Sequence, residues 1–167
     1  ALILLLLLAC FPGQVQLANA TPTSTFTVNW PTDESDANPG DGACLSSNER
    51  CTLRAAIQET NALTGADTII FSVPVVILNN PLPAISDNTG GTTILGGSTL
   101  VSILGTSAGA AADGFVLNSN NNKIQGLDIA TFYGNGIVVN GEHNILGLDG
   151  DNINDALEKN NIRGRGK

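Results

Sequence analysis

Short apolar runs separated by turn-forming residues dominate the pattern of this chain. Thr21 to Val28 alternates Thr or Ser with apolar residues, which is typical of a half-buried strand. Two further runs, Asp67 to Phe71 and Val75 to Leu78, are bounded by Pro, Asn and Gly and are also predicted as strands. No segment after residue 66 keeps a helical period. The pattern predicts a β-rich chain whose first strand covers one end.

One segment has a helical pattern instead. Leu53, Ala56 and Ile57 fall at i, i+3 and i+4, and Thr52 is a suitable N-cap. This spacing predicts a short amphipathic helix that ends between residues 61 and 65. Such a helix can seal the end of a core built from strands, because its apolar stripe can pack on the core while its polar face meets solvent.

A polar loop precedes this helix. Asp33 to Gly42 concentrates acids and turn formers without apolar periodicity, so we predict a loop. Within the helix, Arg54 could bind the carboxylate of a ligand. Pairing with backbone carbonyls or with a loop acid is the favoured role for an arginine at this place. The predicted structural cap comprises Leu53, Arg54, Ala56 and Ile57.

The second half of the chain contains a recurring tripeptide, Ile-x-Gly. It begins at Ile94, Ile103, Ile124, Ile145 and Ile162. Positions 103, 124 and 145 recur at a constant interval of 21, and the similar segments 114–118 and 136–140 repeat at 22. These two markers predict coils of one length, in which parallel strands stack about 4.8 Å apart and the isoleucines form an internal column. We therefore predict an all-β solenoid; an antiparallel β-sandwich is the alternative, and it would not require a constant spacing.

Residues 1–20 have the pattern of an export signal. Residues 1–10 are almost wholly apolar, and Ala18-Asn19-Ala20 forms an A-x-A cleavage site. The apolar run is about half of the roughly 20 residues that a membrane-spanning helix needs, so a permanent anchor is disfavoured. A lipoprotein attached through Cys10 is a minor alternative. We expect a secreted or cell-surface protein with no membrane span beyond the signal segment.

Cleavage after Ala20 would leave two cysteines, Cys44 and Cys51. An oxidising compartment favours a disulfide between them, which would close a loop of eight residues. A metal site and free thiols are the alternatives. The disulfide is preferred to a metal site because only two thiols are available and no histidine lies near them.

Composition limits the partners. The 167 residues carry a net charge of −8 and contain 19 glycines, with 4% aromatic residues. A repetitive architecture packed from Ile, Val and Leu fits these values better than a compact globule of large side chains. Without a basic stripe, neither nucleic acid nor an anionic membrane surface is an expected partner. We also expect the natural protein to continue beyond residue 167.

The acids and the single histidine offer little catalytic chemistry. Asp128 and Asp149 are separated by the same interval as the repeat and could pair on neighbouring coils. No third acid and no arginine share their phase, so turn or solvent-facing positions are favoured. His143 lies in a polar corner, and no Ser or Cys nucleophile stands in a recognisable motif around it. We predict no catalytic residue.

Two acidic segments have the composition of calcium loops. Residues 149–155 lack the EF-hand register, because Ile153 occupies the fifth position and no glycine the sixth. The acids at 33, 36 and 41 form a similar group. Hydrated loops are the favoured interpretation of both segments, so we predict no metal site and no cofactor.

The run Cys51-Thr52-Leu53-Arg54-Ala55-Ala56-Ile57-Gln58-Glu59, together with the acidic loop before it and Gly65 to Phe71 after it, resembles the CSLREA-type domain of bacterial surface proteins. Thr52 and Ala55 stand where the family name implies Ser and Glu. The resemblance implies a right-handed parallel β-helix of the pectin-lyase-like superfamily, with a short N-terminal capping helix. Together with the export signal, it predicts a domain division into a signal peptide (1–20), an N-terminal cap (21–66) and β-helix coils (67–167).

These observations predict a non-catalytic scaffold at the cell surface or outside the cell, for adhesion or carbohydrate contact. Its expected partners are extracellular carbohydrate or a component of a host or cell surface. The superfamily that the chain resembles also contains polysaccharide lyases and hydrolases, so the alternative is a carbohydrate-active enzyme whose catalytic coils lie outside these 167 residues.

Overall fold

A computed structural model describes residues 23–164, which contain eleven strands and two helices. The predicted signal peptide and Cys10 lie outside the described residues. In chain order the elements are β1 Thr25–Val28, α1 Leu53–Ala62, β2 Asp67–Phe71, β3 Val75–Ile77, β4 Thr92–Leu95, β5 Val101–Leu104, β6 Phe115–Leu117, β7 Lys123–Gln125, β8 Leu127–Ala130, β9 Ile137–Val139, β10 Ile145–Leu146, α2 Asp155–Glu158 and β11 Asn161–Arg163.

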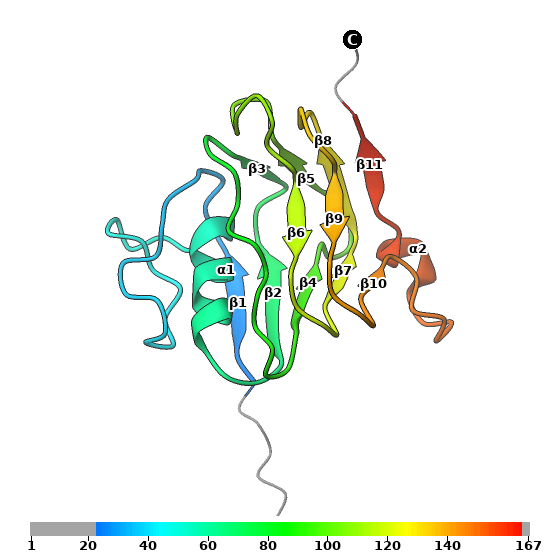
Figure 1. Ribbon diagram of the computed structural model, residues 1–167, viewed down its shortest axis with the longest axis horizontal. Helices are drawn as coiled ribbons and strands as arrows, with labels where there is room; N and C mark the ends of the chain where they lie inside the picture. The colour runs from blue at the N-terminus through cyan, green and yellow to red at the C-terminus, as the bar shows by residue number, and fades with distance from the viewer. Residues whose placement is uncertain (1–22, 165–167) are drawn as a thin grey trace, which may run out of the picture.

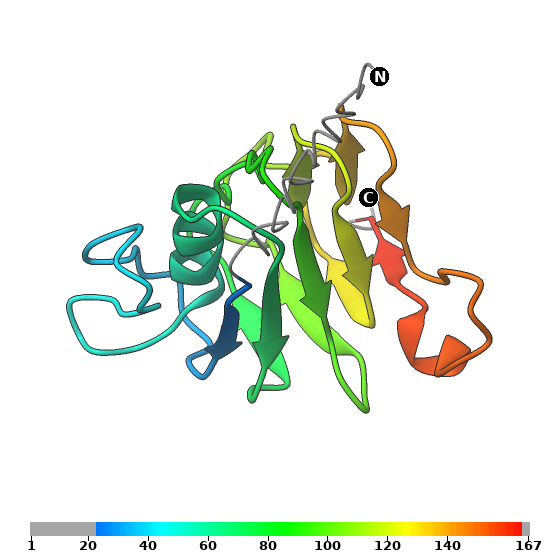
Figure 2. The same ribbon diagram turned by 90° about the horizontal axis from the view of Figure 1, so that it is seen from below.

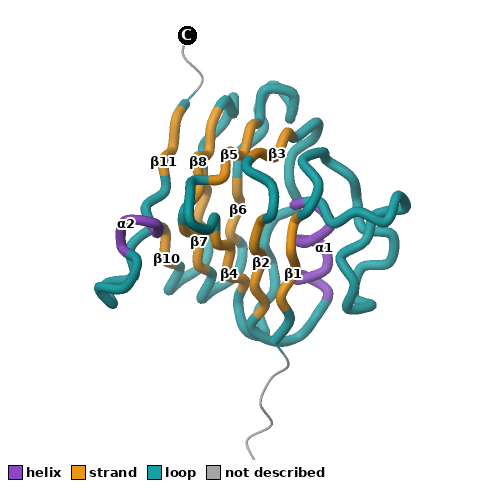
Figure 3. Tube along the Cα trace, turned by 180° about the vertical axis from the view of Figure 1, so that it is seen from behind, coloured by secondary structure: helices purple, strands orange, loops and turns teal. Residues whose placement is uncertain are grey.

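The strands form three sheets, and every pairing between named strands is parallel. The largest sheet has the order β1-β2-β4-β7-β10, the second has the order β11-β8-β5-β3, and β6 pairs with β9 in the third. Figure 1 shows the strands side by side between α1 at one end and α2 at the other, and Figure 3 shows the second sheet from behind. The chain therefore crosses between sheets after almost every strand.

The predicted fold class, an all-β right-handed parallel β-helix, is wrong. The described chain combines short strands in three separate parallel sheets with two helices, and α2 interrupts the chain between β10 and β11. The predicted coil of one length is also absent from the described residues. The interval between register partners is 25 from Ile69 to Ile94 but 30 from Ile94 to Ile124. The connections between strands vary in length because sheet register follows side-chain packing and not sequence spacing.

The prediction of a single column of isoleucines is also wrong. Ile94 and Ile124 are register partners in the first sheet, whereas Ile103 pairs with Ile129 in the second. Residues 103 and 124, although one repeat interval apart, thus belong to different sheets. Three of the five predicted core residues, Ile94, Ile103 and Ile124, are fully buried. Ile145 is half-buried and Ile162 is 51% exposed, because their strands, β10 and β11, are the last of their sheets.

Glycine in the tripeptide has a steric role at two of these positions. A Cβ atom on Gly96 would lie 1.8 Å from the carbonyl oxygen of Gly126, so the two backbones approach too closely for any side chain. Gly126 itself has φ +71°, a conformation that other residues rarely adopt. At Gly96 and Gly126 the Ile-x-Gly pattern therefore marks a place where neighbouring backbone turns meet.

The helix predicted from the sequence is present as α1. The Thr52 side chain accepts a hydrogen bond from the backbone N–H of Ala55 at 3.1 Å and caps the first turn. The helix contacts β1 and β2, and its apolar stripe is buried in the core. In Figure 2, α1 stands beside the N-terminal strands and covers that end of the core. Strand β1 belongs to the same sheet as β2, so the predicted cap and the following segment share one sheet.

Cys44 and Cys51 form a disulfide immediately before α1, and both residues are buried. The acidic loop beside it is held by Glu59, a fully buried residue of α1. Its carboxylate accepts hydrogen bonds from the backbone N–H groups of Gly40 at 2.6 Å and Gly42 at 2.5 Å. Two independent interactions, the disulfide and the hydrogen bonds to Glu59, therefore fix this loop against the helix.

Replacing both cysteines by alanine is expected to lower the free energy of unfolding by roughly 2.5 kcal/mol in the chain-entropy model of an eight-residue loop. Urea unfolding of the oxidised wild type and of the Cys44→Ala/Cys51→Ala variant measures this loss. Reduced wild-type protein is the control and should unfold near the variant. Equal midpoints for oxidised wild type and variant, or two free thiols in the folded protein produced under oxidising conditions, would contradict the prediction.

Candidate functional site

The predicted cap residues lie at one end of the core. Leu53, Ala56 and Ile57 are fully buried. Arg54 donates from Nε to Asp33 Oδ1 at 2.7 Å and from an Nη atom to Asp33 Oδ2 at 3.0 Å, which is a bidentate pair. The side chain of Asp33 is fully buried and that of Arg54 is 12% exposed. This arginine therefore holds a loop acid in place.

The two acids that share the repeat interval, Asp128 and Asp149, have separate basic partners. Asp128 in β8 accepts a hydrogen bond from Arg163 Nε at 2.9 Å, and this contact with Arg163 holds the pKa of Asp128 below its usual range although burial opposes it. Lys123 Nζ lies 2.8 Å from Asp149 Oδ2 and lowers the pKa of that carboxyl. Both acids are thus held ionised, which does not suit a general acid. His143 is exposed in the turn between β9 and β10, with φ +56°.

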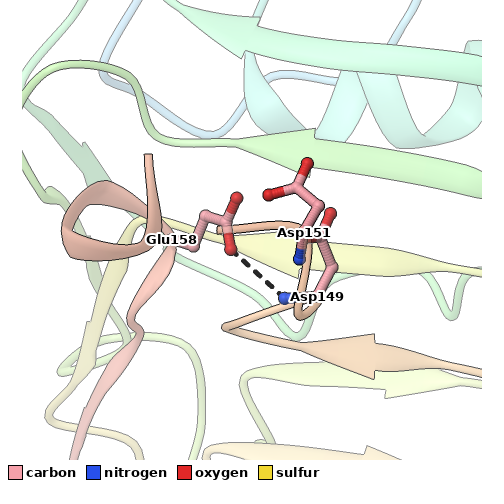
Figure 4. A group of neighbouring side chains, drawn as sticks. All are labelled: Asp149, Asp151 and Glu158. Atoms are coloured by element: carbon pink, nitrogen blue, oxygen red, sulfur yellow. Dashed lines mark hydrogen bonds between the residues drawn. The ribbon is translucent and has the colours of Figure 1, made fainter. Parts of the chain in front are cut away.

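A group of three carboxylates lies beside α2. Asp149, Asp151 and Glu158 each place one oxygen within 4.8 Å of the other two. Figure 4 shows the backbone N–H of Asp149 donating to Glu158 Oε2, at 3.2 Å. Carboxylate oxygens are ligands that Ca²⁺ prefers, but Lys123 already neutralises one of the three. The sequence pattern singled out the loop acids but not Glu158. This residue lies nine positions after Asp149, and the short helix α2 places its carboxylate beside the loop.

A larger candidate site is a cavity of about 530 Å³ between the segment 79–82, the loop 108–113 and β6. Its buried apolar lining comes from Leu82, Ala108 and Ala112, and Val116 is half-buried. Three of the lining residues are polar: Asn79, Asn80 and Asp113. The volume lies within the range of small-ligand sites, which combine apolar walls with a few polar groups.

One wall of this cavity is held by the buried pair described above. Asp33 Oδ2 accepts the backbone N–H groups of Asn79 and Asn80, both at 2.9 Å. Arg54 donates to the carbonyl oxygen of Asn80 at 3.0 Å. No hydrogen bond within residues 23–164 engages the side chains of the two asparagines, which are exposed. The backbone is therefore positioned while both amides stay available to a ligand.

The opposite wall is held by Asp113. Its Oδ1 accepts hydrogen bonds from the backbone N–H of Asn135 at 2.6 Å and from Asn135 Nδ2 at 3.0 Å. A Cβ atom on Gly134 would lie 2.4 Å from the same oxygen, so this turn packs tightly against the carboxylate. Sequence reasoning did not single out Asp113, Asn79 or Asn80 as site residues, because turns of this composition are common without a site.

Comparison of the chain with known protein families, with curated proteins and with solved structures found no match. The resemblance to the CSLREA-type domain therefore stays a prediction from the residues. None of the helices within residues 23–164 has the length and apolar character that a membrane crossing requires.

Proposed function

We propose that this chain is a secreted or cell-surface scaffold that contacts carbohydrate through the cavity lined by Asn79, Asn80 and Asp113, without catalysing a reaction. The single observation that carries the proposal is the combination, in one cavity, of a fixed backbone wall and free amide side chains. The disulfide beside α1 supports an oxidising compartment.

The chemistry of the lining suits a sugar. Each amide offers two donors and one acceptor, and a carboxylate accepts only, so the three polar side chains can match several hydroxyl groups. The apolar residues Leu82 and Val116 offer a surface for the C–H face of a sugar ring. Both walls are anchored by buried or tightly packed acids, which reduces the ordering cost of binding.

The same lining favours binding over turnover. Glycoside cleavage commonly uses two carboxyl groups on either side of the scissile bond, and lyase chemistry needs a base. Among the residues that line this cavity, Asp113 alone is ionisable. The group can accept a hydrogen bond from a hydroxyl, and no second acid or base lines the cavity to transfer a proton.

A glycan array probed with the secreted chain, followed by calorimetry on the bound glycans, tests the proposal. We expect binding to at least one glycan class and a loss of roughly tenfold in affinity for Asn79→Ala/Asn80→Ala, since one net hydrogen bond contributes about 0.5–1.5 kcal/mol. Asn118→Ala/Asn140→Ala is the matched control, because it removes two exposed, paired amides outside the cavity.

Three outcomes would contradict the proposal. They are binding to no glycan, equal losses for the cavity variant and the control variant, and release of unsaturated or reducing ends from polysaccharides incubated with the chain. The last outcome would favour a carbohydrate-active enzyme.

A further inference from the structure

A row of polar residues crosses the largest sheet where its strands begin. Strand registers place five positions side by side, one for each of the five strands of this sheet. They are Ser24, Asp67, Thr92, Asn122 and Asn144. Asp67, Thr92 and Asn122 are almost fully buried, at 2%, 0% and 1% exposure. The middle of this polar row therefore lies inside the molecule and needs internal hydrogen-bond partners.

Most of the polar row follows one hydrogen-bonding rule. The side-chain oxygen of each residue accepts the backbone N–H of its neighbour on the preceding strand of the sheet. Asp67 Oδ1 accepts from Ser24, Asn122 Oδ1 accepts from Thr92, and Asn144 Oδ1 accepts from Asn122. All three distances are 2.8 Å.

The rule fails between Asp67 and Thr92, which are direct register partners. The threonine side chain does not take up the N–H of Asp67, and that N–H donates to the carbonyl oxygen of Gly91 at 3.2 Å. Two buried atoms are left without a hydrogen-bond partner at this break, Asp67 Oδ2 and Thr92 Oγ1. An unsatisfied buried polar atom costs about 1–3 kcal/mol, so two of them on register partners point to a missing hydrogen-bond partner.

The electrostatics of the break also call for a polar partner. Burial raises the pKa of the Asp67 carboxyl, and the nearby carboxylate of Asp87 adds to the rise, while hydrogen bonds from Ser24 oppose it. Asp87 is itself buried and accepts hydrogen bonds from Thr89 and Gly91. No salt bridge of the described residues reaches either acid.

We propose that the break in the polar row is a binding site for one internal water molecule, which donates a hydrogen bond to Asp67 Oδ2 and hydrogen bonds with the Thr92 hydroxyl. Neighbouring strands are about 4.8 Å apart. A water molecule with two hydrogen bonds of about 2.8 Å can bridge that separation. Buried waters make two to four such bonds to groups that lack protein partners.

The Thr92→Asn variant tests the site directly. Its amide oxygen is long enough to accept the Asp67 N–H, as Asn122 does for Thr92, and its amide nitrogen can donate to Asp67 Oδ2. We expect this substitution to displace the water. Thr92→Ser keeps the hydroxyl and is expected to keep the water, so it serves as the matched control. If Thr92→Asn does not fold, Thr92→Ser still tests the site.

The primary measurement is the occupant of the break in atomic-resolution crystal structures of the wild type and both variants. One ordered water in wild type and Thr92→Ser, and none in Thr92→Asn, is the expected result. Direct contact between Asp67 and Thr92, or an empty break in the wild type, would overturn the proposal. So would a melting temperature that changes between sodium and choline chloride at equal ionic strength only while Asp67 is present, since that dependence indicates a bound cation.

A second readout is the pH dependence of Asp67→Asn. A raised pKa in the folded state means that the acid contributes full stability below its ordinary pKa of 3.8 and loses it as the pH rises through the folded value. The amide oxygen can keep the Ser24 N–H, so the amide nitrogen takes the place of Oδ2, donates a hydrogen bond to the water and never ionises. We expect equal melting temperatures for variant and wild type near pH 3, and a variant that melts several degrees higher at pH 7 and retains the water in its crystal structure. Loss of the water in this variant would contradict the assigned bridge.

Discussion

Replacing Arg54 by methionine is expected to lower the free energy of unfolding by about 3–5 kcal/mol, the range for breaking a buried ion pair from one side. The substitution keeps much of the aliphatic volume and leaves the fully buried Asp33 carboxylate without its cation. Asp33 also holds the backbone of Asn79 and Asn80, so local order in that segment should fall as well. Urea unfolding measures the loss of stability, and hydrogen exchange of the backbone N–H groups of Asn79 and Asn80 measures the loss of local order.

The matched control for this prediction is Lys123→Met. Its ion pair with Asp149 is more open, with 30% of the lysine side chain exposed, so a smaller loss is expected because water screens the charges. Equal losses for the two variants would show that burial does not make the pair of Arg54 and Asp33 contribute more to the free energy of unfolding than the more exposed pair. Unchanged exchange at Asn79 and Asn80 in the Arg54 variant would show that the arginine does not order the cavity wall.

Alanine at Ile94 or at Ile124 is expected to lower the free energy of unfolding by about 2–5 kcal/mol, because both side chains are fully buried and each truncation leaves a cavity. The double variant should deviate from the sum of the single losses by at least about 0.5 kcal/mol, since residues in contact couple. Equilibrium unfolding of the two single variants and the double variant measures this coupling. Valine replaces alanine where a variant does not fold.

Ile103 is the matched comparison in this cycle. It is fully buried and stands one repeat interval before Ile124 in the sequence, but it pairs with Ile129 in another sheet. Its coupling to Ile124 should therefore be weaker than that of Ile94. A stronger coupling between residues 103 and 124 than between 94 and 124 would restore the single column that the sequence spacing suggested.

Most of the candidate site could not be predicted from the sequence. Its walls come from the segments 79–82 and 108–113, which have no apolar period, and Asp33 reaches Asn80 over 47 residues. The break in the polar row was equally hidden. The turn role of Asn122 and Asn144 could be expected from residue type, but their alignment with Asp67 and Thr92 depends on strand register.

Local features were determined by the sequence alone. Thr52 followed by apolar residues at helical spacing specifies α1, because capping and amphipathic packing act within a few residues. Short runs bounded by turn formers specify strands such as β2 and β3 for the same reason. The pairing of strands was decided only by the tertiary structure. The tripeptides at 94 and 103 are similar, yet they lie in different sheets. Side chains far apart in the chain select the register by packing in a shared core, and a repeat length carries no information about which face each residue meets there.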